Sequence, residues 1–243
     1  MTEKSVTCSV VETNGATATK LVIHLDLASK SDLHSFTTIE QNHSQVTTEQ
    51  IDTSAAAYVR YTSIKSGQPG SVNQTERTSQ VLNVWSNDKL ASPSLFSRTA
   101  LGNCVVPLAS LPRGRAEPFM RELRSGKILQ VDYSQTKRET IQGKPVVVYE
   151  VAVQPQPYVD FVKRVAVAYG LKDFNSVESA DYVQKSPEQM KFYINAGTRR
   201  LEKIVFNGRE RTITFSNYGK ISPWSVPVSA VEPQELQKRF EAR

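Results

Sequence analysis

The sequence predicts a mainly β domain of the α+β class, in which an antiparallel sheet curls around an apolar interior lined by helices. Three observations support this fold class. Polar and apolar residues alternate in short runs from Lys4 to Ile64, turn dipeptides separate these runs, and a strongly apolar helix follows later in the chain. Alternation with a period of two residues is typical of half-buried antiparallel strands. We expect one domain over residues 1–243, with an extended C-terminal tail over 219–243 that has room for a short charged helix.

The composition fits a folded domain rather than a disordered chain. Its 243 residues, 39% of them hydrophobic, are enough to bury a substantial core. Thirty Lys and Arg against 24 Asp and Glu leave a formal charge of +6, which favours acidic partners such as anionic lipid headgroups or nucleic acid without selecting between them. The chain has no run of 18 apolar residues, so we expect no transmembrane helix.

The N-terminal strands are predicted from the alternation and from the turns between the runs. Their expected ranges are Ser5–Thr13, Lys20–Leu27, a third run from Leu33, Val46–Asp52 and Ala57–Ile64. Asn14-Gly15 suits the positive φ angles of a tight hairpin turn. A helix is the alternative for the second run, since Leu21 and Leu25 share a helical face, but the β-rich neighbours favour a strand. After an exposed loop over Lys65–Thr78, the run Val81–Trp85 is expected to resume the sheet.

The rest of the chain is predicted to combine two helices with hairpins. The expected elements are a helix from Glu117-Pro118 to Gly126, a hairpin of Ile128–Thr140 with Pro145–Gln154, a helix from Pro157 to Gly170, and strands over Gln189–Asn195, Arg200–Phe206 and Arg211–Tyr218. Proline is tolerated in the first turn of a helix, so Pro118 and Pro157 mark the two helix starts. Ala196-Gly197 and Asn207-Gly208 mark the turns between the last three strands.

The helix from Pro157 to Gly170 is the most informative element. Apolar residues cover most of its circumference at helical spacing and leave only a narrow polar stripe, so we expect it to be buried on most of its surface. With apolar residues elsewhere it supplies the candidate lining of a ligand cavity, which is Trp85, Phe119, Leu123, Tyr158, Phe161, Val162, Val165 and Tyr169. An ordinary packed core is the alternative interpretation, because a helix that covers a sheet must bury such a surface anyway.

Residues able to perform catalysis or bind metals form no recognisable motif. Cys8 and Cys104 lack zinc-site spacing and are either buried free thiols or a single disulfide, which would need an oxidising compartment. His24 and His34 can face each other across a hairpin, as a cross-strand pair rather than as metal ligands. Nucleophile-elbow, Walker and dinucleotide glycine patterns are absent from the sequence, so we expect no enzyme, no cofactor and no metal.

Basic residues gather in two places, near the first helix and near the last hairpins. They are Arg113, Arg115, Arg121, Arg124 and Lys127 in the first group, and Arg199, Arg200, Lys203, Arg209 and Arg211 in the second. Solvated charge is the simplest interpretation, and a basic rim that meets an anionic membrane surface is the second. Nucleic acid is not expected as a partner, because aromatic residues do not interleave with the basic ones as a stacking surface requires.

Several segments carry a resemblance to a known family. They are Phe192-Tyr193-Ile194-Asn195, Thr198-Arg199-Arg200-Leu201-Glu202-Lys203, Ile213-Thr214-Phe215-Ser216-Asn217-Tyr218-Gly219 and the earlier Ala57-Tyr58-Val59-Arg60-Tyr61. In order and pattern they resemble the LolA/LppX-like group of extracytoplasmic lipoprotein and lipid carriers. The resemblance implies a strongly bent antiparallel sheet or incomplete barrel whose concave face is covered by helices and encloses an apolar cavity. The chain departs from the group in lacking the usual N-terminal helix and secretory signal.

The apolar helix and the resemblance together predict a noncatalytic extracytoplasmic domain that binds an apolar ligand, such as a lipid or a lipoprotein acyl chain. An envelope protein-interaction or sensor domain on the same scaffold, without a ligand, is the alternative. The first residues hold no apolar signal segment, which fits a cytosolic protein or a chain cut after its targeting segment; a strand that begins at Ser5 favours the second. We therefore expect membrane anchoring through an N-terminal segment outside this chain. The ligand, the partner and the oligomeric state are not predicted.

Overall fold

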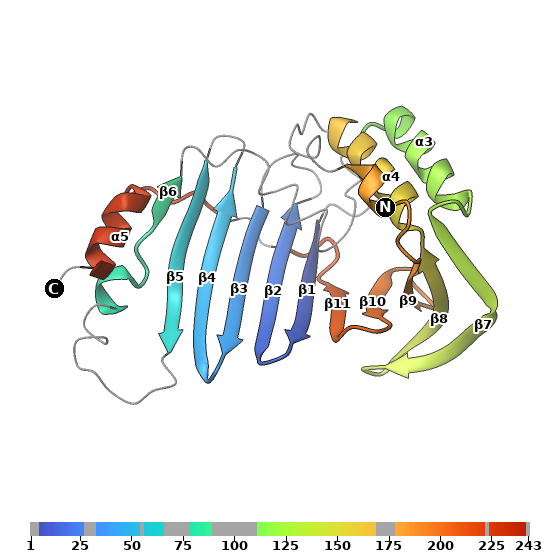
Figure 1. Cartoon of the computed structure of the whole chain (residues 1–243), viewed down its shortest axis with the longest axis horizontal. Helices are drawn as coiled ribbons and strands as arrows, with labels where there is room; N and C mark the ends of the chain where they lie inside the picture. Colours follow the sequence, from blue (N-terminus) through green and yellow to red (C-terminus); the bar gives the residue numbers. More distant parts are fainter. Residues whose placement is uncertain are drawn as a thin grey trace.

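Eleven strands form one open antiparallel sheet (Figure 1). The computed structural model describes residues 5–26, 33–53, 56–65, 78–88, 111–168, 178–221 and 224–241. The strand order is β6-β5-β4-β3-β2-β1-β11-β10-β9-β8-β7, and each neighbouring pair is antiparallel. β6 and β7 end the sheet on opposite sides and do not pair, so the sheet is open. The predicted fold class, a mainly antiparallel sheet with helices, is confirmed.

The strands and helices have the following bounds in chain order. The strands are β1 (Ser5–Asn14), β2 (Thr17–Asp26), β3 (Leu33–Gln41), β4 (Ser44–Asp52), β5 (Ala57–Lys65), β6 (Ser86–Asp88), β7 (Leu129–Ile141), β8 (Lys144–Val153), β9 (Glu188–Asn195), β10 (Leu201–Phe206) and β11 (Arg211–Ser216). The helices are α3 (Arg113–Arg124), α4 (Pro155–Ala168), the short 3-10 helix η3 (Ser179–Tyr182) and α5 (Pro233–Glu241). In Figure 1, α3 and α4 lie at the β7 end of the sheet and α5 lies beside β6.

The N-terminal hairpins form where the alternation predicts them. β1 and β2 pair from Ser5↔Asp26 to Asn14↔Thr17, around a turn in which Gly15 has a φ of 58°. β2 also pairs along its length with β3. The helical alternative for the second run is therefore wrong. A helix there would leave the facing backbone groups of both neighbouring strands without partners, which is costly in a buried sheet.

The junction of β1 with β11 joins two separate meanders. All other neighbours in the sheet are consecutive strands, whereas here the first strand meets the last. The register runs from Thr7↔Ser216 to Glu12↔Arg211. β1 is thus the central strand through which the N-terminal and C-terminal halves become one sheet.

The strand predicted over Val81–Trp85 is wrong. Residues 78–81 form a helical turn, and the sheet resumes only at β6. In place of a strand, Leu82 makes one isolated parallel bridge to Tyr61. Val81 is 1% exposed, so the helical turn rather than strand pairing buries this residue. A short apolar run in a sequence does not distinguish these two outcomes. The neighbouring loop predicted over Lys65–Thr78 lies almost wholly outside the described residues.

The predicted starts of both helices are late. α3 begins at Arg113, so Pro118 lies inside the helix rather than in its first turn. Pro112 precedes the helix in an extended conformation, and its carbonyl accepts hydrogen bonds from the backbone N–H of Arg115 and Ala116. α4 likewise begins at Pro155 rather than Pro157. An internal proline removes one hydrogen bond near the helix start, and helices tolerate this where their apolar side is packed.

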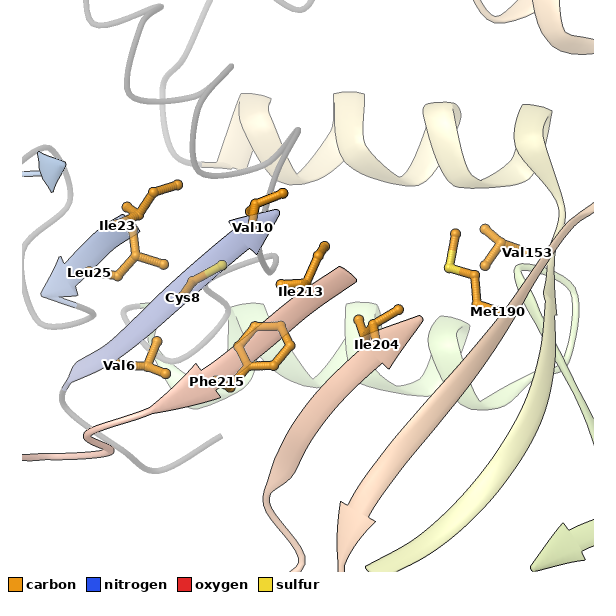
Figure 2. Close-up of a cluster of buried hydrophobic side chains, with 10 residues drawn as sticks. All are labelled: Val6, Cys8, Val10, Ile23, Leu25, Val153, Met190, Ile204, Ile213 and Phe215. Atoms are coloured by element: carbon orange, nitrogen blue, oxygen red, sulfur yellow. The ribbon is translucent and has the colours of Figure 1, made fainter. Parts of the chain in front are cut away.

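One face of the sheet is apolar, and we call it the inner face. It is the face on which Val6, Cys8 and Val10 of β1 lie, and its buried cluster spans six strands from β2 to β8. The cluster consists of Val6, Cys8, Val10, Ile23, Leu25, Val153, Met190, Ile204, Ile213 and Phe215 (Figure 2). Alternate residues of the same strands point to the opposite, outer face, which carries His24 and His34.

Both sheet edges carry features that disfavour pairing with another chain. Along β7, residues 133–136 bulge out between the pairs Asp132↔Glu150 and Lys137↔Val148. Bulges and charged residues on an exposed edge interrupt the regular row of backbone groups that another strand needs. At the other edge, Val231 of the C-terminal tail forms a parallel bridge to Ser86 of β6.

The β7–β8 turn offers a direct test of this backbone geometry. Gly143 has a φ of 74°, whereas Gly114 in α3 has an ordinary φ, and an added Cβ would meet nothing within 4 Å at either position. We expect Gly143→Ala to destabilise the protein by about 1 kcal/mol through backbone strain, and the control Gly114→Ala to stabilise it by about 0.5–1 kcal/mol. Urea unfolding measures both changes. Equal effects of the two substitutions would contradict the assigned hairpin turn.

Candidate functional site

Helix α4 covers the inner face at the β8–β9 end of the sheet. It follows β8 directly, and the backbone N–H of Tyr158 bonds the carbonyl of Gln154 at 3.0 Å. Phe161, Val162, Val165 and Ala166 are its buried residues. Val167 is 64% exposed, so the prediction that the buried apolar face extends to Val167 is wrong. α3 and η3 both lie against α4, yet Arg164 and Val167 near its C-terminal end stay exposed.

Helix α3 lies against α4 and is held there by apolar and polar contacts. The rings of Phe119 and Phe161 meet edge to face, with centroids 5.9 Å apart and planes at 88°. Glu122 of α3 forms an ion pair with Arg164 of α4. Arg115 donates to the carbonyl of Ala168 at 3.1 Å, which satisfies one of the free carbonyls at the α4 C-terminus. The two helices therefore form one lid over the end of the sheet.

A second apolar cluster lies between these helices and the sheet. Its buried members are Leu111, Ile128, Phe161, Val162, Val165 and Ala166, and its half-buried members include Ala116, Phe119, Met120, Leu123, Leu129 and Tyr158. Tyr158 and Leu129 also pack against the inner-face cluster around Cys8. The apolar region is consequently continuous from α3, beneath α4, to β2.

Tyr158 is the polar group at the junction of the two clusters. Burial raises the pKa of its hydroxyl, Arg211 opposes this rise, and Glu188 adds to it. The ring of Phe206 lies under the guanidinium of Arg211, with 5.0 Å from Cζ to the ring centroid. The hydroxyl therefore stays protonated at neutral pH and is a hydrogen-bond donor within an otherwise apolar region.

Most of the predicted cavity residues come together, and one does not. Phe119, Leu123, Tyr158, Phe161, Val162 and Val165 belong to the cluster beneath α4. Trp85 lies at the other end of the sheet, beside β6, where the guanidinium of Arg60 stacks over its ring at 4.6 Å. Tyr169 lies outside the described residues. Trp85 was grouped with the helix only by its apolar character, which carries no information about distance in the fold.

The sequence did not single out several residues of this region. Ile128 is fully buried between α3 and β7, and its carbonyl accepts a hydrogen bond from Gln154 N–H at 2.9 Å. Leu111 and Ala166 are buried in the same cluster. Ile128 lies two residues after Gly126, one position beyond the residue that usually makes the apolar contact at a helix C-terminus, so it carried no recognised packing signal. Leu111 carried no such signal either.

Cys8 at the centre of β1 is disulfide-bonded and 0% exposed. The free-thiol alternative is therefore wrong for this residue. Cys104, the other cysteine of the sequence, lies outside the described residues.

The positions of the polar side chains in the described ranges decide whether they can hold a metal ion. Within them no group of three or more His, Cys, Asp or Glu is placed to hold a metal ion. The basic residues of α3, which are Arg113, Arg115, Arg121 and Arg124, are exposed. No helix among the described residues is long and apolar enough to cross a membrane.

Comparison with known proteins gives a likeness of fold only. No family model matches the chain, and no curated protein matches its sequence. Among solved structures, the chain is similar to the crystal structure of LprF from Mycobacterium bovis, at 14% sequence identity and a TM-score of 0.45. The match covers 94% of this chain and 90% of that chain. A likeness of this degree does not establish a shared function.

The packing beneath α4 predicts that substitutions on its two faces differ strongly in their effect on the free energy of unfolding. Phe161 is 0% exposed and Val167 of the same helix is 64% exposed. We expect Phe161→Ala to lower the free energy of unfolding by about 3–5 kcal/mol, and Val167→Ala to change it by no more than about 0.5 kcal/mol. Chemical denaturation followed by circular dichroism measures both. A small loss for Phe161→Ala would show that its ring is not packed between the helices and the sheet.

Proposed function

We propose that this protein is a noncatalytic envelope domain that binds an apolar ligand, such as a lipid or a lipoprotein acyl chain, between α4 and the inner face of the sheet. The observation that carries the proposal is the continuous apolar region from α3 to β2, with Tyr158 as its internal polar group. Ligand sites of this kind are mostly apolar with a few polar groups that fix orientation. Burial of each methylene contributes about 0.8 kcal/mol to such binding.

The lid is the natural place for ligand entry. α3 and α4 are joined to each other by the Glu122–Arg164 ion pair and the Arg115–Ala168 hydrogen bond, and both of these polar contacts are exposed. Exposed ion pairs contribute little stability, so they do not oppose a movement of the two helices over the sheet. The exposed basic side chains of α3 suit contact with anionic headgroups while a lipid enters, at about 1 kcal/mol per residue near such a surface.

The placement in an envelope is supported by the disulfide at Cys8. Structural disulfides persist in oxidising compartments and are rare in the cytosol. Cys104 is the partner we propose for Cys8, since the sequence holds two cysteines. The same proposal includes a membrane anchor in an N-terminal segment outside this chain. The resemblance of the sequence to the LolA/LppX-like group supports it.

The disulfide proposal has a thermodynamic test. We expect Cys8→Ser and Cys104→Ser each to destabilise the protein by about 2–4 kcal/mol, because the loss of a cross-link frees the unfolded chain. If the two cysteines are bonded to each other, the double variant loses no more than the larger single loss. Losses that add in the double variant, or a non-reducing peptide map without a Cys8–Cys104 peptide, would contradict the pairing.

Ligand binding is tested by native mass spectrometry of the purified protein before and after extraction with organic solvent. We expect bound lipid-sized mass that extraction removes. Leu123 of α3 is half-buried in the apolar cluster between the lid and the sheet. Val205 of β10 is half-buried on the outer face. Leu123→Gln should weaken rebinding of a phospholipid by about tenfold, because part of the contact area becomes polar, while the control Val205→Gln leaves it unchanged.

The binding experiment also has a defined negative outcome. A protein that carries no extractable mass and rebinds no phospholipid, with both variants folded, would exclude the ligand proposal. It would favour the alternative of a protein-interaction or sensor domain on the same scaffold.

A further inference from the structure

A row of side chains crosses the outer face of the sheet from β1 to β5. The Thr7 hydroxyl lies 3.0 Å from Nδ1 of His24, whose ring faces that of His34 on the next strand with centroids 5.5 Å apart. Nε2 of His34 lies 2.8 Å from Oε1 of Glu49. Arg60 donates from Nε to Oε2 of the same carboxylate at 2.6 Å. The row therefore links five adjacent strands through side chains alone.

The C-terminal tail passes over this row and touches it at two points. At the start of the tail, Nδ2 of Asn217 donates to the Thr7 hydroxyl at 3.3 Å. Further on, the ring of Trp224 lies against that of His34, with centroids 5.5 Å apart and planes tilted by 43°. The tail then reaches β6, where Val231 N–H bonds the Trp85 carbonyl at 2.8 Å and Asn87 N–H bonds the Val231 carbonyl at 2.9 Å. We call the segment Trp224–Val231 the strap.

We propose that the strap is a pH-sensitive latch, held on the outer face while His24 is neutral and loosened when His24 is protonated beside His34. Its release uncovers the outer edge of β6, because Val231 is bonded to the side of β6 that faces away from β5. An uncovered strand edge is a surface to which an extended peptide segment can add by backbone hydrogen bonds.

The hydrogen-bond directions explain why His24 is the sensitive ring. Asn217 donates to the Thr7 oxygen, and the Thr7 hydroxyl can donate its own proton to Nδ1 of His24 when that nitrogen is unprotonated. A proton at Nδ1 leaves the Thr7 hydroxyl proton without this acceptor. The Thr7 hydroxyl must then reorient, which disturbs its hydrogen bond from Asn217 at the point where the tail leaves the sheet.

The two rings have different neighbours. His34 faces Glu49 on one side and the Trp224 ring on another, and both are compatible with a cation there. His24 faces Thr7, Phe36 and His34, so among the described residues a proton on His24 meets a second imidazole and no carboxylate. Burial, and then His34, lower the pKa of His24 below its ordinary value of 6.5.

The sign of the pH effect follows from this lowered pKa. The folded state binds the His24 proton less tightly than the unfolded chain does, so the stabilisation is complete above the ordinary pKa of histidine and is lost as the pH falls below it. Asp52 acts in the opposite direction. Its burial raises the pKa of a carboxyl on the inner face, so acidification relieves a penalty there and cannot account for a loosened strap.

Hydrogen exchange of the intact protein tests the latch, with rates corrected for the intrinsic effect of pH. We expect protection of the Val231 and Asn87 amides to fall by about fivefold or more between about pH 7.5 and about pH 5, while the β8 amides keep theirs. His24→Gln should remove this pH dependence. His43 is exposed in the β3–β4 turn at a φ of 64°, and His43→Asn, which suits that conformation, should retain it.

Three outcomes would overturn the proposal. The first is equal or greater strap protection at the lower pH. The second is a parallel loss in the strap and in β8, which would indicate global unfolding. The third is unchanged pH dependence in His24→Gln, with His34→Gln as the substitute if that variant does not fold.

Discussion

The pairing of β1 with β11 is the constraint on which the other parts of the molecule depend. Every other pair in the sheet joins strands that are consecutive in the chain, but this one joins residues such as Cys8 and Phe215 from its two ends. Closing so long a loop costs conformational entropy, and long-range pairing of this kind is slow. The buried inner-face cluster offsets that cost, since β1 and β11 together contribute half of its side chains.

The two faces of the sheet differ because a strand alternates, and β2 shows this within three residues. Ile23 and Leu25 are buried in the inner cluster, while His24 between them belongs to the outer row. A shift of one residue in register would exchange these environments and place an imidazole in the apolar interior. The proposed ligand region and the proposed latch thus occupy opposite faces of the same strands. The backbone hydrogen bonds that set the register of these strands therefore determine which residues face each region.

The helices show where local sequence is a weaker guide. The apolar spacing in α4 correctly located the helix and its buried residues Phe161, Val162 and Val165. It also suggested burial of Val167, which is exposed, because periodicity reports how apolar a face is and not how many neighbours are available to cover it. Trp85 illustrates the same limit at longer range. Its ring stacks with Arg60, a partner twenty-odd positions away that only the sheet brings near.

The sequence by itself determined the strands, most of their turns and the apolar side of α4, because these depend on alternation, on glycine at positive φ and on helical spacing within a few residues. Only the tertiary structure decided which strands are neighbours, that Tyr158 joins two clusters, and that the tail lies over His34. These are contacts between residues far apart in the chain. Their free energy comes from burial and hydrogen bonding that exist only once the sheet has formed. The disulfide at Cys8 stands between the two, since a cysteine is visible in the sequence but its bond forms only where the fold brings a second sulfur atom close.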